Sequence, residues 1–224
     1  MKNYNYVLDF KPDVVDEALI NSALDYAWRH TPSKNNFMNY SVHVIGPSHN
    51  SLKHSLYDVC LAKQMSANNE NFKTLKEYNR HLDSIDAKPN FRNITSAPYV
   101  LIYTQRVETK YNLLQQQNIN KGMVFEQTFQ RGTKKHRNAN NVSKLECGMF
   151  SVNFASKCLE NGIDVSYVGC LPLELEAWQE PEWSFITDTP ILIQLAGHGK
   201  TYKKDVCPPE IDLKPDFERV VNVL

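Results

Sequence analysis

Apolar residues recur at helical spacing in three long stretches of the chain. They predict helices over residues 13–29, 51–64 and 145–160, and a shorter helix over residues 173–178. Pro12 precedes the first helix, and the Asp13 side chain can cap its free N–H groups. Gly162 follows the third helix at a position that tolerates a positive φ, so we expect that helix to stop there.

Short apolar runs between turn residues predict strands over residues 41–45, 99–104, 163–168 and 190–196. The run 99–104 is almost continuously apolar, which is typical of a strand buried on both faces. Residues 68–93 are polar and should hold one exposed helix, and residues 107–144 are the least regular part of the chain. Because helices alternate with buried strands, the pattern favours an α/β or α+β fold with one sheet covered on both faces.

The composition sets bounds on size and partners. The 224 residues are enough for one large domain, and they show no internal repeat and no linker. Lys and Arg number 25, as do Asp and Glu, so no net charge favours nucleic acid or an anionic membrane. No apolar run approaches the ~20 residues of a transmembrane helix, and the first residues lack the apolar segment of a signal peptide.

Cysteine and histidine spacing indicates neither a metal site nor a disulfide framework. The five cysteines are an odd number, and no two stand at C-x-x-C spacing. His30 and His43 fit no metal-ligand spacing, so no metal is expected. Together these features favour a reducing, cytoplasmic compartment.

Four sequence blocks in a fixed order carry a resemblance to a known family. Residues 31–44 follow the first helix and enter a strand, and they begin Thr-Pro-Ser-Lys-Asn-Asn. Residues 96–103 begin Ser-Ala-Pro and continue as an apolar strand, and residues 147–169 hold a long helix, its stop and a strand. Residues 191–198 form a late strand that ends in Gly-His. From about Phe10 to Val221, the chain resembles the nitroreductase family of FMN flavoproteins.

The resemblance implies a fold and an assembly. The fold would be an α+β sandwich in which helices flank a central, mostly antiparallel sheet, as a single nitroreductase-like domain over residues 1–224. Residues 107–144 would form a variable lid that sets substrate choice. The arm of residues 197–224 would be exchanged in a homodimer whose interface holds the flavin.

The resemblance also assigns cofactor contacts. The turn that follows Pro32 would serve the flavin of the opposite subunit, to which Ser33, Lys34 and Asn36 offer a hydroxyl, a charge and an amide. A later strand end would face flavin N5 with its backbone, and a glycine there permits a close approach. Its residues are Tyr167, Val168, Gly169 and Cys170.

The phosphate end of the site departs from the family. The family clamps the FMN phosphate with an arginine cluster near its N-terminus, but residues 4–10 contain no arginine. By family position, the nearest cations are Lys203 and Lys204, with Lys200 and Lys214 behind them. Three outcomes stay open: the lysines replace the arginines, FMN binds weakly, or the flavin site is vestigial.

The resemblance implies an FMN-dependent oxidoreductase of nitroreductase type. NAD(P)H would deliver a hydride to flavin N5, and the flavin would reduce a nitro, quinone or similar acceptor, with no catalytic side chain assigned. The alternative is a flavin-binding or vestigial dimeric protein without reductase turnover, which would sequester flavin, fragment it or act as a scaffold. A third hypothesis is RNA binding through the basic residues between Arg131 and Arg137, against which the balanced charge counts.

Overall fold

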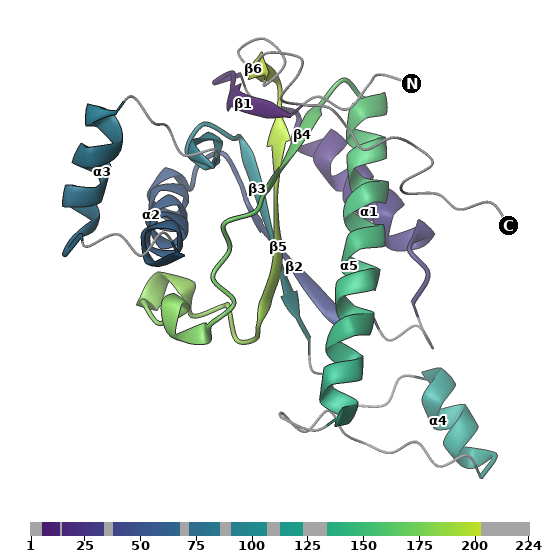
Figure 1. Ribbon diagram of the computed structural model, residues 1–224. Coiled ribbons are helices and arrows are strands. Elements are labelled where there is room, and N and C mark those ends of the chain that lie inside the picture. The colour runs from purple at the N-terminus through teal and green to yellow at the C-terminus, as the bar shows by residue number, and fades with distance from the viewer. Residues whose placement is uncertain are drawn as a thin grey trace, which may run out of the picture.

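A four-stranded antiparallel sheet in the order β2-β3-β5-β4 forms the centre of the protein (Figure 1). The computed structural model describes residues 6–13, 15–33, 38–67, 72–85, 91–106, 113–122 and 134–202. The four strands are β2 (Tyr40–Ile45), β3 (Tyr99–Gln105), β4 (Asp164–Val168) and β5 (Pro190–Gly197). A separate antiparallel pair joins β1 (Val7–Phe10) to β6 (Gly199–Tyr202). The predicted α+β class and the mostly antiparallel sheet are confirmed.

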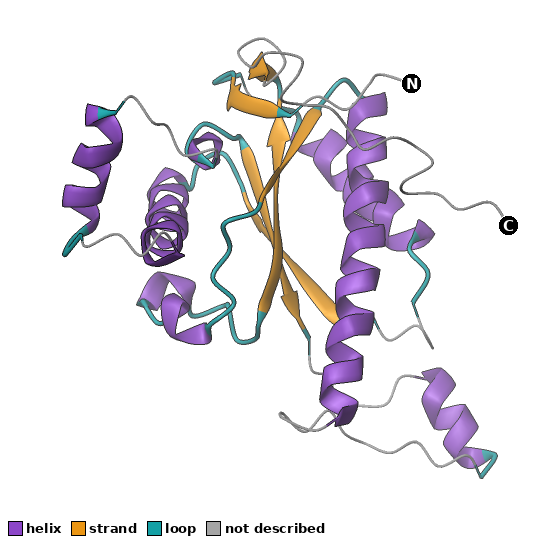
Figure 2. Cartoon of the chain, viewed as in Figure 1, coloured by secondary structure: helices purple, strands orange, loops and turns teal. Residues whose placement is uncertain are grey.

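Helices cover both faces of the sheet (Figures 1 and 2). One face carries α1 (Glu17–His30) and the long α5 (Lys134–Glu160), which contact each other along their lengths. The other face carries α2 (Asn50–Ala67) and α3 (Leu75–Ser84). Three short 3₁₀ helices pack on that side as η2 (Arg92–Ile94), η3 (Leu175–Trp178) and η4 (Pro181–Trp183). The helix α4 (Leu113–Asn120) lies beyond the end of α5, away from the sheet.

The sheet divides the core into two hydrophobic clusters. Val100, Ile102 and Leu195 point to the α2 side, while Leu101 and Tyr103 point to the α1 and α5 side. Successive strand residues point to opposite faces, so β3 can be apolar throughout only if both faces are covered. All seven residues of β3 are buried, as its continuous apolar run predicts.

The first helix begins later than the sequence predicts. Asp16, not Asp13, caps α1, and its carboxylate accepts a hydrogen bond of 2.9 Å from the Ala18 N–H. Pro12 and Asp13 instead line a cavity beside the end of β1. The helix starts directly after Asp16, whose side chain satisfies one of the free N–H groups of its first turn.

The stretch 107–144 is more regular than predicted. It contains α4, and α5 begins at Lys134 rather than at residue 145. The first turns of α5 extend past the end of the sheet, and their sequence shows no apolar periodicity from which a helix could be predicted (Figure 1). Residues 107–112 and 123–133, with Arg131 among them, lie outside the described part of the chain. None of the described helices is long and apolar enough to cross a membrane.

Candidate functional site

The end of β4 presents its backbone on the open edge of the sheet. β4 is an edge strand, and the Tyr6 hydroxyl donates to the Tyr167 carbonyl at 3.3 Å, so that carbonyl points away from β5. Val168 is buried and pairs with Ile193 of β5. Peptide groups alternate in direction along an antiparallel strand, so we expect the next outward N–H to be that of Gly169.

Gly169 has free space around its α-carbon. A Cβ built on this residue would meet no atom of the protein within 4 Å, apart from its chain neighbours. Its φ is not positive, so neither packing nor backbone conformation requires glycine here. The missing side chain instead leaves the peptide group approachable by a flat ligand.

The Cys170 thiol is a packing group. It is half-buried and lies against the hydrophobic cluster on the α2 side. Burial raises the pKa of Cys170, so the thiol is neutral near pH 7 and a poor nucleophile.

The turn after α1 is tied to α5 through Ser33. The Ser33 hydroxyl donates to Glu146 Oε2 at 3.0 Å and accepts the Met38 N–H at 2.8 Å. Glu146 is only 2% exposed. Met38 takes a positive φ of 46°, which is uncommon for a residue with a side chain. Ser33 therefore has no second hydrogen to donate, and it can offer a ligand only an oxygen lone pair.

Two buried amide oxygens lie close to this turn. Asn39 Oδ1 and Gln105 Oε1 are buried, and neither has a hydrogen-bond partner within the described protein. The two residues that carry them are neighbours in the fold, because Tyr40 pairs with Gln105 and the Arg106 N–H donates to the Asn39 carbonyl. Unpaired buried acceptors are costly, so these two oxygens fit a donor supplied by a ligand or a second subunit.

The predicted contact residues are only partly brought together. Tyr167, Val168, Gly169 and Cys170 lie at one strand end, and Ser33 lies with the exposed Pro32 at the end of α1. Lys34, Asn36, Lys203 and Lys204 lie outside the described residues, so their roles stay predictions. No cluster of His, Cys, Asp and Glu in the described ranges is placed to hold a metal ion.

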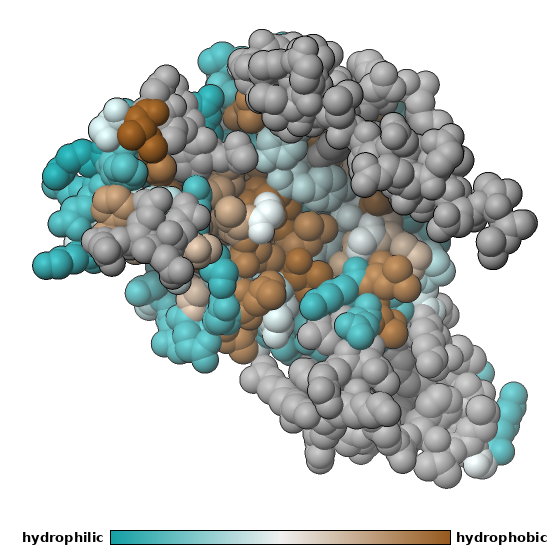
Figure 3. Space-filling model, in the orientation of Figure 1, coloured by the Kyte–Doolittle hydropathy of each residue, from teal (hydrophilic) through white to brown (hydrophobic). Residues whose placement is uncertain are grey.

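One face of the molecule carries an exposed apolar surface. Leu145 and Val152 of α5 are 65% and 58% exposed, and Leu173 after β4 is also exposed. Gly148 lies between the two α5 residues, and a Cβ on it would meet nothing within 4 Å beyond its own helix. Figure 3 shows hydrophobic side chains gathered in the middle of this face. The surface lies beside the Gly169 strand end, because β4 follows α5 directly and contacts it.

Solved structures share this architecture over almost the whole chain. A nitroreductase-like protein of Streptococcus mutans is 16% identical, with a TM-score of 0.60 over 99% of this chain and 94% of that one. A candidate NAD(P)H:FMN oxidoreductase of Staphylococcus epidermidis is 11% identical, with a TM-score of 0.65 over 99% and 92%. A BluB-like flavoprotein of Clostridium difficile is 16% identical, with a TM-score of 0.59 over 99% and 95%. The fold is that of the nitroreductases.

The likeness to nitroreductases lies in the structure. No family model matches the sequence, and no curated protein matches it either. The low identity agrees with a divergent nitroreductase-like protein, as the missing N-terminal arginines suggest. Lys200, one of the lysines named for the FMN phosphate, is already paired within the protein, because its Nζ lies 3.6 Å from Asp9 Oδ2.

Sequence reasoning missed Glu146, Asn39 and Gln105. Glu146 lies four residues before the buried Phe150, on the side of α5 that faces the core. A carboxylate on an apolar helix stripe needs a polar partner, so Glu146 could have been predicted from the sequence to make a buried polar contact. Asn39 and Gln105 gave no comparable signal, since Asn39 directly precedes β2 and Gln105 is the last residue of β3, and polar residues are ordinary at strand ends.

Proposed function

We propose that this protein binds FMN and acts as an oxidoreductase of nitroreductase type. It would pass a hydride from NAD(P)H, through flavin N5, to a nitro, quinone or similar acceptor. The observation that carries the proposal is the Gly169 strand end, which opens onto the apolar face of a nitroreductase fold. FMN supplies the hydride chemistry when it is bound.

The chain's own groups would bind and orient the flavin. The Gly169 N–H would donate to the polar edge of the ring, and Val168 and Cys170 would hold that peptide group against the core. The apolar surface around Leu173 would exclude water from the face of the ring. Lys34 and Asn36 would add a charge and an amide from the turn whose first residue, Ser33, donates a hydrogen bond to Glu146.

We further propose a homodimer built on the α5 face. Leu145 and Val152 lie two turns apart on one side of α5, and Gly148 between them allows a second helix to approach closely. In such a dimer, the turn after Pro32 and the arm of residues 197–224 would belong to the site of the opposite subunit. The arm beyond Tyr202 lies outside the described residues.

The phosphate would be held by Lys203 and Lys204. No arginine occurs in residues 1–28, and Lys200 is paired with Asp9, so these two lysines are the next cations along the chain after β6. A buried phosphate needs such charged donors. The four cysteines among the described residues form no disulfide, which supports our proposal of a cytoplasmic location.

A turnover measurement tests the oxidoreductase proposal. FMN-loaded protein should oxidise NADH or NADPH faster than the same concentration of free FMN, with a quinone as acceptor. A Leu173→Asp variant should lose this acceleration, whereas Ile85→Asp, on the exposed end of α3, should keep it. A rate that equals that of free FMN for the parent protein would contradict the proposal.

A flavin-binding dimer without turnover is the second candidate. The absence of the family's arginines and the engagement of Lys200 favour it, because a weakly held phosphate gives a weakly held cofactor. This candidate predicts that FMN binds but is not reduced by NAD(P)H under anaerobic conditions. Bleaching of the flavin absorbance by NAD(P)H would exclude it.

A further inference from the structure

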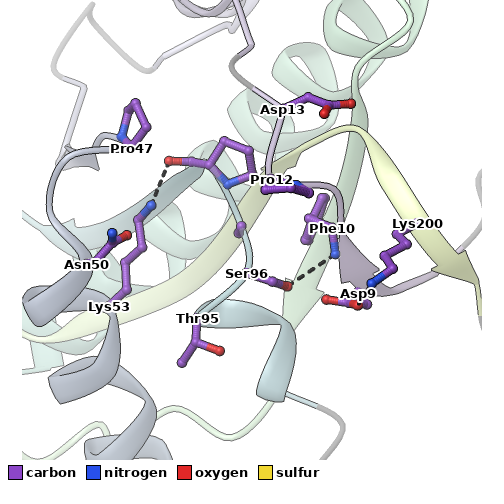
Figure 4. A pocket seen from close by; sticks show the side chains of 12 residues that line it. Asp9, Phe10, Pro12, Asp13, Pro47, Asn50, Lys53, Thr95, Ser96 and Lys200 are labelled. Carbon is purple, nitrogen blue, oxygen red and sulfur yellow. Dashed lines mark hydrogen bonds and ion pairs between the residues drawn. The ribbon is translucent and has the colours of Figure 1, made fainter.

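The cavity lined by Pro12 and Asp13 lies at the far end of β2 from the Ser33 turn. It has a volume of about 330 Å³ and is lined by the end of β1, the first turns of α2 and the segment before β3 (Figure 4). This is the end of the sheet where β2 finishes and β3 starts, whereas Ser33 and Met38 precede the first residue of β2. The volume is near the low end of the ~300–1,000 Å³ typical of ligand pockets, so it suits a small metabolite rather than FMN or NAD(P)H.

A buried lysine lines this cavity. Lys53 is 2% exposed, and its Nζ donates to the Pro98 carbonyl at 2.9 Å. An ammonium group has three N–H donors, so two of them have no partner among the described residues. No carboxylate of the described chain forms an ion pair with Lys53. Lysine is almost never fully buried without a charged partner.

The position of Lys53 in its helix makes the unpaired charge less favourable still. The Lys53 N–H donates to the His49 carbonyl, in the first turn of α2. The N-terminus of a helix carries a partial positive charge, so a cation there is destabilised and an anion is stabilised. Both the ammonium and the helix end therefore favour an anion in the same small volume.

The acidic residues of the cavity do not neutralise Lys53. Figure 4 shows Asp9, Asp13 and Lys200 across the cavity from Lys53 and Asn50. Asp9 is engaged by Lys200 at 3.6 Å. Burial lowers the pKa of Lys53 to about 8, and no acidic neighbour opposes that shift. The amine thus keeps its proton at neutral pH without a counter-charge.

We propose that this cavity binds a small anionic metabolite, with its phosphate or carboxylate group on Lys53. Asn50 lies beside Lys53 and offers an amide to the same group. Asp9 and Asp13 on the opposite wall favour a ligand whose far end carries hydroxyl or amino groups. The cavity shares no residue with the Gly169 strand end, and Lys53 is not among the cations assigned to the FMN phosphate, so the proposal does not rest on flavin binding.

Calorimetry with two probes tests the proposal and separates the two anion classes. Inorganic phosphate and succinate are titrated separately into the parent protein, and at least one should bind saturably. Lys53→Met should weaken that binding at least about tenfold, because it removes the charge and keeps the length of the side chain. Lys200→Met is the matched control, since it removes an exposed cation of the same cavity, and it should change the affinity much less.

A second measurement uses only the parent protein and one labelling variant. In protein with ¹³C-labelled lysine, the Lys53 Cε resonance should shift on addition of the probe that binds, while Lys200 should not. Lys53→Arg, which keeps the charge, identifies the resonance. Failure of both probes to bind the parent, or undiminished binding by Lys53→Met, would overturn the proposal, as would a Lys53 resonance that does not respond to a saturating probe.

Discussion

Ser33 and Glu146 stand 113 positions apart in the sequence, yet the Ser33 hydroxyl donates to the Glu146 carboxylate at 3.0 Å. The contact joins the turn after α1 to the side of α5, and Ser33 closes the same turn by accepting the Met38 N–H. A hydrogen bond to a buried carboxylate is among the stronger polar contacts in a protein. The two described ends of the turn that we assign to the flavin, Ser33 and Met38, are therefore hydrogen-bonded to each other, and Ser33 is hydrogen-bonded to α5.

Removing this hydrogen bond should destabilise the protein. Ser33→Ala leaves the buried Glu146 carboxylate with one donor fewer, so the free energy of unfolding should fall by about 1–3 kcal/mol. Urea denaturation measures the change. Ser156→Ala, at an exposed serine of α5, should have little effect. Equal stability of the two variants would show that the Ser33 contact does not hold the turn.

The amide of Asn36 should contribute to FMN affinity. Asn36→Ala should weaken FMN binding by about 1–3 kcal/mol, because a polar edge of the flavin loses its partner. Quenching of flavin fluorescence measures the affinity, and Asn141→Ala, at an exposed position of α5, serves as the control. If the Asn36 variant binds FMN as the parent does, the assignment of the turn is wrong.

Lys203 and Lys204 should recognise the phosphate of FMN. Replacing both with Ala should weaken FMN more than riboflavin, which has no phosphate, and salt should reduce the difference where the lysines are exposed. The control replaces two exposed lysines near α3, Lys73 and Lys76, with Ala. It removes the same number of positive charges as the Lys203, Lys204 variant. Equal losses for the two flavins would mean that Lys203 and Lys204 do not contact the phosphate.

The α5 face should mediate dimer formation. Val152→Asp places a charge in the middle of the exposed apolar surface, and it should shift the protein to a monomer in sedimentation velocity at micromolar concentration. Ile85→Asp introduces the same charge at another exposed apolar residue and should leave the dimer intact. A parent protein that sediments as a monomer would contradict the dimer outright.

Lys53 should make stability depend on pH. Burial lowers its pKa from 10.5 to about 8, so between these values the unfolded chain holds a proton that the folded protein has lost. Stability contributed by this residue therefore rises with pH across that window. Relative to Lys53→Met, the parent should gain about 3 kcal/mol from pH 7 to pH 10.5.

A second lysine variant is the control for this pH profile. Lys200→Met removes an exposed lysine that lines the same cavity, and we expect the pH profile of this variant to follow that of the parent. Denaturant unfolding of the three proteins at several pH values measures the difference. Parallel profiles for the parent and Lys53→Met would mean that the lysine is not buried as a charge.

Elements with local signals could be predicted from the sequence, and elements that depend on distant partners could not. β3 was evident because each of its residues has a covered face. β1 has only four residues, and it is a strand only because β6 pairs with it near the other end of the described chain. The start of α5 was missed because its first turns lie beyond the sheet and show no apolar stripe.

The site shows the same division. The Gly169 strand end followed from a motif that is contiguous in the sequence, and the structure places those residues together. Lys53 lies on the buried face of α2 with Leu56 and Cys60, but a lysine gives no apolar signal there. Its Pro98 partner belongs to the distant segment before β3. Residues that contact a site from distant segments of the chain leave no periodic pattern in the sequence.

Retention of FMN is the most direct test of the central claim. The purified protein is mixed with excess FMN, passed through gel filtration, and its visible absorbance is recorded, with Asn36→Ala and the Lys203, Lys204 double variant treated in the same way. We predict that the bands of oxidised flavin elute with the parent protein at close to one flavin per chain, and that both variants retain less. A parent protein that elutes without flavin absorbance, while it remains folded by circular dichroism, would contradict the account.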